Sequence, residues 1–225
     1  MLLDLVAPAM QSITYVMLLI VLIVYYLKAF RQPQLRRFWL LFALASTMSL
    51  LANIAWIIHF NVTQSALSRI SAIDLFYVTS YILVGIALWT YPTALSRRVW
   101  LWMAGAMSLA LLAVTAVYFG DAAAREKGTL VNFIIYAAYP IFDAGQITLA
   151  WMRYGSVRGT RWEKLALLLA CGITSYGLAN AVELTGYVSA PILGGFLQNL
   201  FWMLRHVFVL MAALSVRTPA DVLEE

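Results

Sequence analysis

Residues 97–118, RRVWLWMAGAMSLALLAVTAVY, decide the fold of this chain. Two arginines precede an apolar run without a single charge. A helix rises about 1.5 Å per residue, so about 20 such residues cross a hydrocarbon core of about 30 Å. Six further runs have similar character, at residues 8–27, 38–59, 73–92, 130–152, 164–185 and 194–215. Because the links between them are short, the sequence predicts an all-α membrane protein, a seven-transmembrane-helix antiparallel bundle.

The composition excludes an ordinary soluble domain. The chain of 225 residues is 64% hydrophobic and 11% charged, whereas soluble domains are about one quarter charged. We therefore expect residues 1–217 to form one transmembrane domain, followed by a short cytoplasmic tail at 218–225. The net charge of +5 does not indicate nucleic-acid binding, because the basic residues border the apolar runs, where anionic lipid headgroups attract them.

The basic residues are distributed unevenly between the two sides of the predicted bundle. Lys and Arg are retained on the cytoplasmic side of a membrane. We therefore predict that the N-terminus lies outside and the C-terminus in the cytoplasm. The residues assigned to the cytoplasmic side are Lys28, Arg31, Arg36, Arg37, Arg97, Arg98, Arg153, Arg158, Arg161, Lys164 and Arg217; only Arg69, Arg125 and Lys127 fall in the opposite loops, and Arg205 lies inside the last run.

Polar residues within the runs recur at steps of three and four, which places each set on one helix face. An ionisable residue in a span is costly and points to a functional site. The second run carries a milder stripe at Ser46, Ser49, Asn53 and Trp56, while the first and fourth runs are almost purely aliphatic and are expected to face lipid. The candidate ligand-binding or switch residues are Asp74, Tyr77, Tyr81, Tyr139, Asp143, Asn180, Glu183, Asn199, Trp202, Arg205 and His206.

Two of these charges lie at nearly the same depth. Asp143 is about 20 Å and Arg205 about 16 Å from the outer ends of their helices at the usual rise per residue. A lone Arg at that depth costs about 2.5 kcal/mol or more. The simplest arrangement is an Asp143–Arg205 ion pair supported by tyrosine hydroxyls. Such a pair would serve either as interhelical packing or as a ligand- or proton-linked switch.

No cofactor is predicted. His206 and His59 lie at different depths, which disfavours a haem held by two histidines, and no helix offers paired ligands at a metal spacing. The last run has no lysine for a retinal Schiff base, and Cys171 is the only cysteine.

Four stretches, read together, resemble the seven-helix membrane input module of bacterial signalling proteins, which precedes diguanylate cyclase, phosphodiesterase or histidine kinase domains. The resemblance implies a multi-pass protein of the inner membrane that signals. Since no output domain follows Arg217, we expect a free-standing version that signals through a partner or serves another role. Asn53 and Asn199 stand where that group usually has an acid. The stretches are Ala52-Asn53-Ile54-Ala55-Trp56; Ala72-Ile73-Asp74-Leu75-Phe76-Tyr77 with Tyr81 and Gly85; Ala138-Tyr139-Pro140-Ile141-Phe142-Asp143; and Gln198-Asn199-Leu200-Phe201-Trp202 with Ala212-Ala213-Leu214.

Three functions remain open at this point. The leading one is a receptor-like or accessory membrane protein that binds a small ligand, or a partner membrane protein, through polar and aromatic residues inside the bundle. The second is a small seven-helix transporter, although Pro140 is the only deep helix break and such carriers usually have paired breaks. The third is a lipid-modifying enzyme. No nucleophile, base or metal cluster is apparent at the interface, so we predict no catalytic residue.

Overall fold

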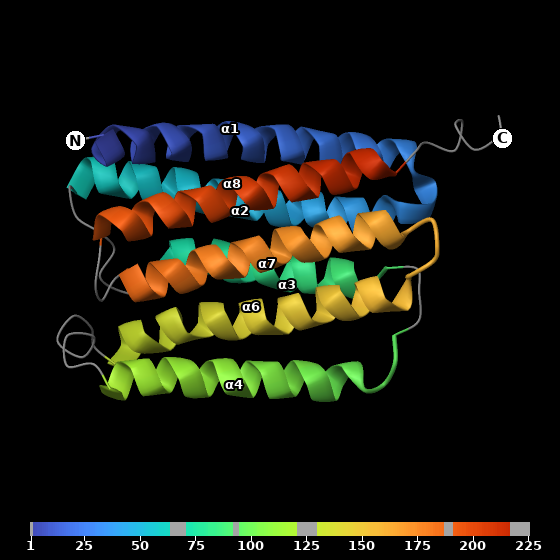
Figure 1. The fold of residues 1–225 in the computed structure, drawn as a ribbon. Helices are drawn as coiled ribbons and strands as arrows, with labels where there is room; N and C mark the ends of the chain where they lie inside the picture. Colours follow the sequence, from blue (N-terminus) through green and yellow to red (C-terminus); the bar gives the residue numbers. More distant parts are fainter. Residues whose placement is uncertain (1, 64–70, 92–94, 121–129, 187–190, 217–225) are drawn as a thin grey trace.

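The computed structural model describes the chain apart from residues 1, 64–70, 92–94, 121–129, 187–190 and 217–225. The described residues form seven α-helices and one short 3-10 helix, and none of them lies in a strand. The helices lie side by side and run alternately up and down (Figure 1). In chain order they are α1 (Leu2–Arg31), η1 (Pro33–Leu35), α2 (Arg36–Thr63), α3 (Ala72–Trp89), α4 (Val99–Gly120), α6 (Leu130–Ser156), α7 (Glu163–Gly186) and α8 (Pro191–Ser215).

Several of these helices are suited to a membrane. The predicted all-α class is confirmed for the described residues, and five of the seven predicted spans coincide with helices that are long and apolar enough to cross a bilayer. Ile73–Trp89 of α3 is apolar but shorter. Within the described parts, the five stretches are Met10–Arg31, Pro33–Thr63, Val99–Ala116, Glu163–Val182 and Gly195–Ser215.

Six of the helices close into a ring. Each contacts the next in the order α1, α2, α3, α6, α7, α8, and α8 returns to α1. The helix α4 lies outside the ring, at the edge of the bundle in Figure 1, and packs mainly against α6. It also meets α3 where the Trp89 and Trp100 rings lie 4.8 Å apart. Its Leu101 is 74% exposed and Trp102 65% exposed, in accord with the lipid-facing expectation for this helix. The expectation for α1 was wrong in part, because Val21 and Tyr25 of α1 are buried in the core.

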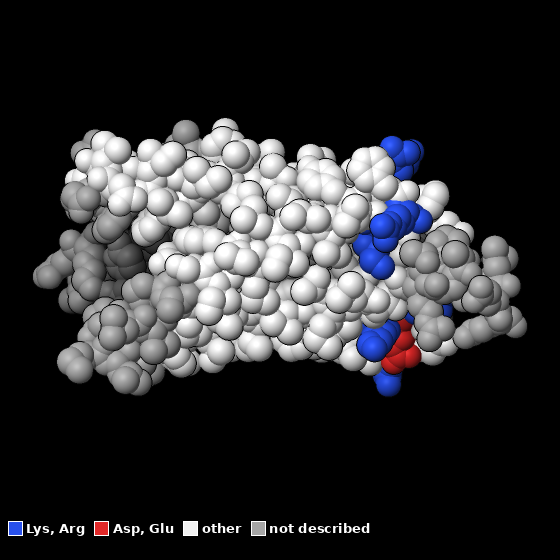
Figure 2. Space-filling model, turned by 90° about the horizontal axis from the view of Figure 1, so that it is seen from above, with Lys and Arg blue, Asp and Glu red and all other residues white. Residues whose placement is uncertain are grey.

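Apart from Arg205, the described Lys and Arg side chains gather near one end of the molecule, where Figure 2 shows those of one face in blue. This end, here called the basic end, contains the links from α1 to α2, from α3 to α4 and from α6 to α7. The other end is called the opposite end. Arg69, Arg125, Lys127 and Arg217, which entered the prediction of orientation, lie outside the described residues, as does the tail 218–225.

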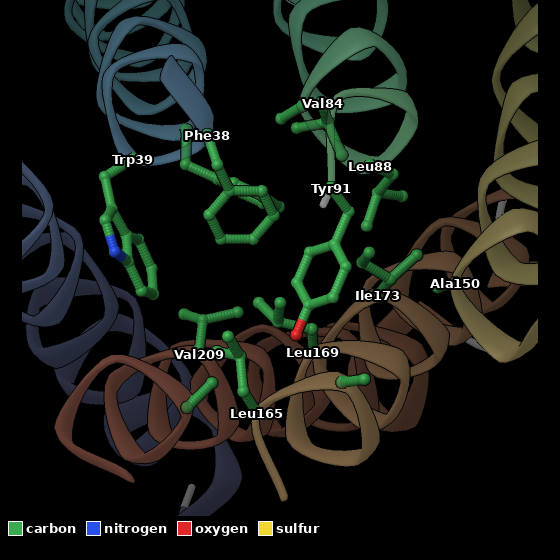
Figure 3. Close-up of a cluster of buried hydrophobic side chains, with 14 of the residues drawn as sticks. Phe38, Trp39, Val84, Leu88, Tyr91, Ala150, Leu165, Leu169, Ile173 and Val209 are labelled. Carbon is green, nitrogen blue, oxygen red and sulfur yellow. The ribbon is translucent and has the colours of Figure 1, made fainter. Parts of the chain in front are cut away.

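The core near the basic end is closed by packed aromatic rings, here called the basic-end plug: Tyr25, Phe38, Trp39, Phe42 and Tyr91. The centroids of Phe38 and Trp39 are 4.9 Å apart, and those of Phe38 and Tyr91 5.3 Å apart. Figure 3 shows Phe38 and Tyr91 facing Leu165, Leu169 and Val209 across the interior. Edge-to-face rings at such distances stabilise a core beyond the area that they bury.

A buried arginine secures the end of α3. Arg153 of α6 is only 3% exposed. Its Nε donates to the Leu88 carbonyl and its Nη2 to the Trp89 carbonyl, both at 2.6 Å. The last carbonyls of a helix have no partner within the helix, and a cation there also interacts favourably with the helix dipole. Arg153 therefore caps α3 from a neighbouring helix.

The link between α1 and α2 secures the end of α8 in a similar way. Lys28 Nζ donates to the Val216 carbonyl at 2.7 Å and Gln32 Nε2 to the same carbonyl at 3.3 Å. Trp39 Nε1 in turn donates to Gln32 Oε1 at 2.7 Å. The point at which the chain leaves α8 is thus bonded to α1 and to the plug.

Candidate functional site

The centre of the bundle contains a closed set of three hydrogen bonds among Tyr81, Asp143 and Asn180. The Tyr81 hydroxyl donates to Asp143 Oδ1 at 2.9 Å, and Asn180 Nδ2 donates to Asp143 Oδ2 at 2.8 Å and to the Tyr81 hydroxyl at 2.6 Å. The Asn180 amide donates both of its protons, and the Tyr81 hydroxyl donates one proton to Asp143 and accepts one from Asn180. Every side-chain donor of these two residues is therefore used. Asp143 is 4% exposed. These residues, each predicted separately, join α3, α6 and α7 in one network.

A glycine lets α6 and α7 approach closely enough for this network. A Cβ built on Gly177 of α7 would lie 2.8 Å from Ile147 Cδ1 and 3.2 Å from Asp143 Cβ, both on α6. Real Cβ atoms do not approach that closely without a shift of the neighbour. Gly177 is one helical turn from Asn180. The absence of a side chain at Gly177 therefore brings α6 close to the part of α7 that carries Asn180.

A second pair of predicted residues meets nearer the opposite end. The Tyr139 hydroxyl donates to Asp74 Oδ1 at 2.8 Å. Asp74 Oδ2 accepts from the backbone of Ser71 at 2.9 Å in a capping box at the start of α3. The acid at the third position of a capping box satisfies a backbone donor of the helix end. Asp74 thus has a structural role that the sequence analysis missed, although Ser71 three residues before it is the sequence signal of a capping box.

Tyr77 completes the polar contacts of α3. Its hydroxyl donates to Asn53 Oδ1 of α2 at 3.0 Å. Asn53 Nδ2 donates in turn to the Ser49 carbonyl at 2.7 Å, and the Ser49 and Ser80 hydroxyls are 2.8 Å apart. Ser49 and Asn53 of the α2 stripe therefore face α3.

The predicted Asp143–Arg205 ion pair is absent from the described residues. The two oxygens of Asp143 accept from Tyr81 and Asn180, and the Cζ atom of Arg205 lies 4.1 Å from the centroid of the Tyr176 ring. An arginine over an aromatic face is stabilised by the ring quadrupole. The Arg205 backbone packs against Gly172 of α7 and Asp143 against Gly177, so the two charges lie at different levels along α7. The expected ion pair is replaced by a cation–π contact.

The polar face of α8 is poorly satisfied by the described protein. Buried atoms on it without a hydrogen-bond partner are Asn199 Oδ1, Trp202 Nε1 and His206 Nδ1. Asn199 uses its Nδ2 on the Gly195 carbonyl of its own helix, at 2.9 Å. Arg205 likewise has no hydrogen-bond partner among the described residues. Buried polar atoms are nearly always hydrogen-bonded, so three neighbouring exceptions on one helix set α8 apart from α3, α6 and α7 within the described part of the chain.

A central cavity adjoins this face, between the three-residue network and the basic-end plug. Its volume is about 20 Å³. A cavity needs roughly 10–15 Å³ on this measure to admit a water molecule, so the space suits one or two waters or a small ion. All six ring helices line it; among the lining residues are Tyr25, Ser46, Tyr81, Tyr176, Arg205 and His206.

The remaining predicted residue and two residues that were not predicted complete the comparison with the sequence. The side chain of Glu183 lies outside the described residues. Sequence reasoning did not select Tyr25, because α1 looked lipid-facing, nor Tyr176, whose position on the stripe of α7 was the one available signal. No group of three metal-ligating side chains occurs within the described part of the chain.

Comparison with known proteins identifies no relative: no family model, curated protein or solved structure matches the chain. The resemblance to the seven-helix input modules therefore stays a prediction.

Proposed function

We propose that this chain is a receptor-like or accessory membrane protein, with seven spans and an external N-terminus, which binds a small polar ligand inside its helix bundle. One observation carries the proposal. Tyr81, Asp143 and Asn180 of α3, α6 and α7 satisfy one another, whereas Asn199 Oδ1, Trp202 Nε1 and His206 Nδ1 of α8 are buried and find no hydrogen-bond partner within the described protein. A face with both donors and acceptors left open is complementary to a ligand with the matching groups.

The packing supports access from the opposite end. Asn199 and Trp202 lie on the part of α8 toward that end, and Arg205 follows one turn deeper. The basic-end plug closes the other side with rings 4.9–5.5 Å apart. Under the proposed orientation, the ligand reaches the site from outside the cell and meets a closed inner half.

The same closure argues against the small transporter. A carrier exposes its site alternately to both sides and usually has paired broken helices at the site. Pro140 lies inside α6, but the described part of α1 continues without a break through the corresponding depth. Transport remains the alternative outcome of the experiment below.

The hydrogen bonds at the end of α8 suggest how a partner would sense the ligand. The Val216 carbonyl is held by Lys28 and Gln32, so a small movement of α8 changes contacts at the proposed cytoplasmic surface. Packed helices shift by steps of 1–2 Å in known switches. A signalling partner at this surface fits the resemblance to the input modules.

A thermal-shift screen in lipid nanodiscs tests the proposal. We expect small polar compounds that stabilise the wild type to lose most of that effect in Trp202→Phe, which removes one unpartnered donor, and in Asn199→Leu. Trp102→Phe is the matched control, because Trp102 is 65% exposed on α4. If every stabilising compound acts equally on all these variants, or none stabilises the wild type, the proposal is wrong. Uptake of a stabilising compound into sealed proteoliposomes would favour the transporter instead.

A further inference from the structure

Among the residues that the structure describes, no acidic side chain lines the central cavity beside the cation on its wall. Arg205 lines it and forms no hydrogen bond within the described protein. The nearest acid, Asp143, is not among the lining residues, and both of its oxygens are engaged by donors. A cation in the middle of a membrane domain is costly until an anion or several dipoles compensate it.

Two further side chains leave donors on the same cavity. Tyr25 of α1 is 2% exposed and Ser46 of α2 is 5% exposed, and both line the cavity. Their hydroxyls have no hydrogen-bond partner within the described part of the chain. They therefore differ from Ser49 and Ser80, whose hydroxyls are 2.8 Å apart. Three potential donors from three helices thus line the same cavity, beside His206, whose Nδ1 also has no partner within the described protein.

We propose that the cavity is a site for one small monovalent anion, held against Arg205 by the hydroxyls of Tyr25 and Ser46. The proposal rests on the proposed function in one respect, since the anion would be either the charged group of the bound ligand or a separate ion beside it. The volume of about 20 Å³ accommodates a halide or a single carboxylate group and excludes a sulfate or phosphate ester. The Tyr176 ring holds the guanidinium in place, and charge-assisted hydrogen bonds supply the affinity.

The experiment compares the melting temperature of the purified full-length protein in sodium chloride, sodium acetate and sodium gluconate at equal ionic strength. Gluconate is too large for the cavity and serves as the reference anion. A ligand bound only by the folded state raises the melting temperature with the logarithm of its concentration. At ten times its dissociation constant, we expect chloride or acetate to give a rise of about 3–6 °C over gluconate.

Variants separate this site from general salt effects. Tyr25→Phe and Ser46→Ala each remove one hydroxyl, and we expect each to reduce the anion-dependent rise by at least half. Tyr26→Phe is the matched control, since its hydroxyl lies 3.4 Å from that of Thr47 and Tyr26 does not line the cavity. Arg205→Gln should abolish the rise; if it does not fold, the two hydroxyl variants still decide the result.

Each outcome has one meaning. A rise with chloride alone assigns an inorganic ion, and a rise with acetate as well assigns a site for carboxylates. Equal melting temperatures in all three salts, or a rise that Tyr25→Phe and Ser46→Ala leave unchanged, overturn the anion site and leave the cavity to water. In that case a neutral compound whose effect depends on Trp202 would still uphold the proposed function, so the two failures are distinguishable.

Discussion

Asn180 Nδ2 lies 2.8 Å from Asp143 Oδ2 and thereby joins α7 to α6 in the middle of the bundle. The same nitrogen donates to the Tyr81 hydroxyl on α3 at 2.6 Å. One amide thus holds three of the six ring helices together, opposite the unsatisfied face of α8. Predictions about stability follow from this network, and predictions about function follow from that face.

The first prediction compares two double-mutant cycles. Asn180→Leu and Asp143→Asn each leave a buried polar group without its partner, at a cost of about 1–3 kcal/mol. Because the residues touch, we expect a coupling energy of about 0.5–3 kcal/mol between them. The cycle of Asp143→Asn with Arg205→Met should give a smaller coupling, since no direct bond joins that pair. Unfolding in a mixed-micelle denaturant series measures both cycles. A larger coupling energy for Asp143 with Arg205 would contradict this prediction and support the ion pair that the sequence suggested.

The second prediction concerns the cap of α3. Arg153→Met removes two short hydrogen bonds to the carbonyls of Leu88 and Trp89. Hydrogen bonds to charged groups contribute about 1.5–3 kcal/mol each, so we expect a loss of at least 2 kcal/mol in the free energy of unfolding. Arg97→Met, at an exposed position of the same basic end, is the control and should change stability by less than about 0.5 kcal/mol. Equal effects of the two variants would mean that the hydrogen bonds from Arg153 to the end of α3 add nothing to the free energy of unfolding.

The third prediction tests the close approach of α6 to α7. Gly177→Ala places a methyl group 2.8 Å from Ile147 Cδ1 and 3.2 Å from Asp143 Cβ. Overpacking of this kind costs about 1–3 kcal/mol. Gly155→Ala on α6 meets no atom within 4 Å, and there alanine favours the helix by up to about 1 kcal/mol. The two variants should therefore shift the melting temperature in opposite directions; a shift of the same sign in both would contradict the packing.

The fourth prediction concerns orientation. In a Cys171→Ala background, a cysteine at position 123 should react with an impermeant thiol reagent in intact cells. A cysteine at position 96, near the basic residues Arg97 and Arg98, should react only after permeabilisation. The reason is that Lys and Arg are retained on the cytoplasmic side. Labelling of position 96 in intact cells would reverse the proposed orientation.

The sequence predicts the depth of a side chain along its helix better than the direction in which that side chain points. The rise per residue gives only an approximate depth. Polar residues at helical spacing within apolar runs led to the selection of Tyr81 and Asp143, which the structure brings together. The direction around a helix axis depends on how neighbouring helices are rotated, which one sequence does not state. For that reason Arg205 was paired with Asp143 although it lies over Tyr176.

Other residues were missed because one residue type serves two purposes. Arg153 counted only as one of the basic residues that set orientation, yet it is buried and caps α3. Asp74 was read as a candidate site because an acid stands in an apolar run, although it also completes a capping box. Tyr25 was overlooked because its helix is aliphatic on most of its circumference, while the single face that turns inward contributes to the cavity.

The most direct test of the central claim is an experimental structure in a lipid bilayer, with attention to the polar face of α8. The account predicts density that is not protein within hydrogen-bond distance of Arg205 and of Trp202 Nε1 or Asn199 Oδ1, with Asn180 still bonded to Asp143. A structure in which α8 is rotated so that protein groups satisfy all these atoms, with no density beside Arg205, would contradict it.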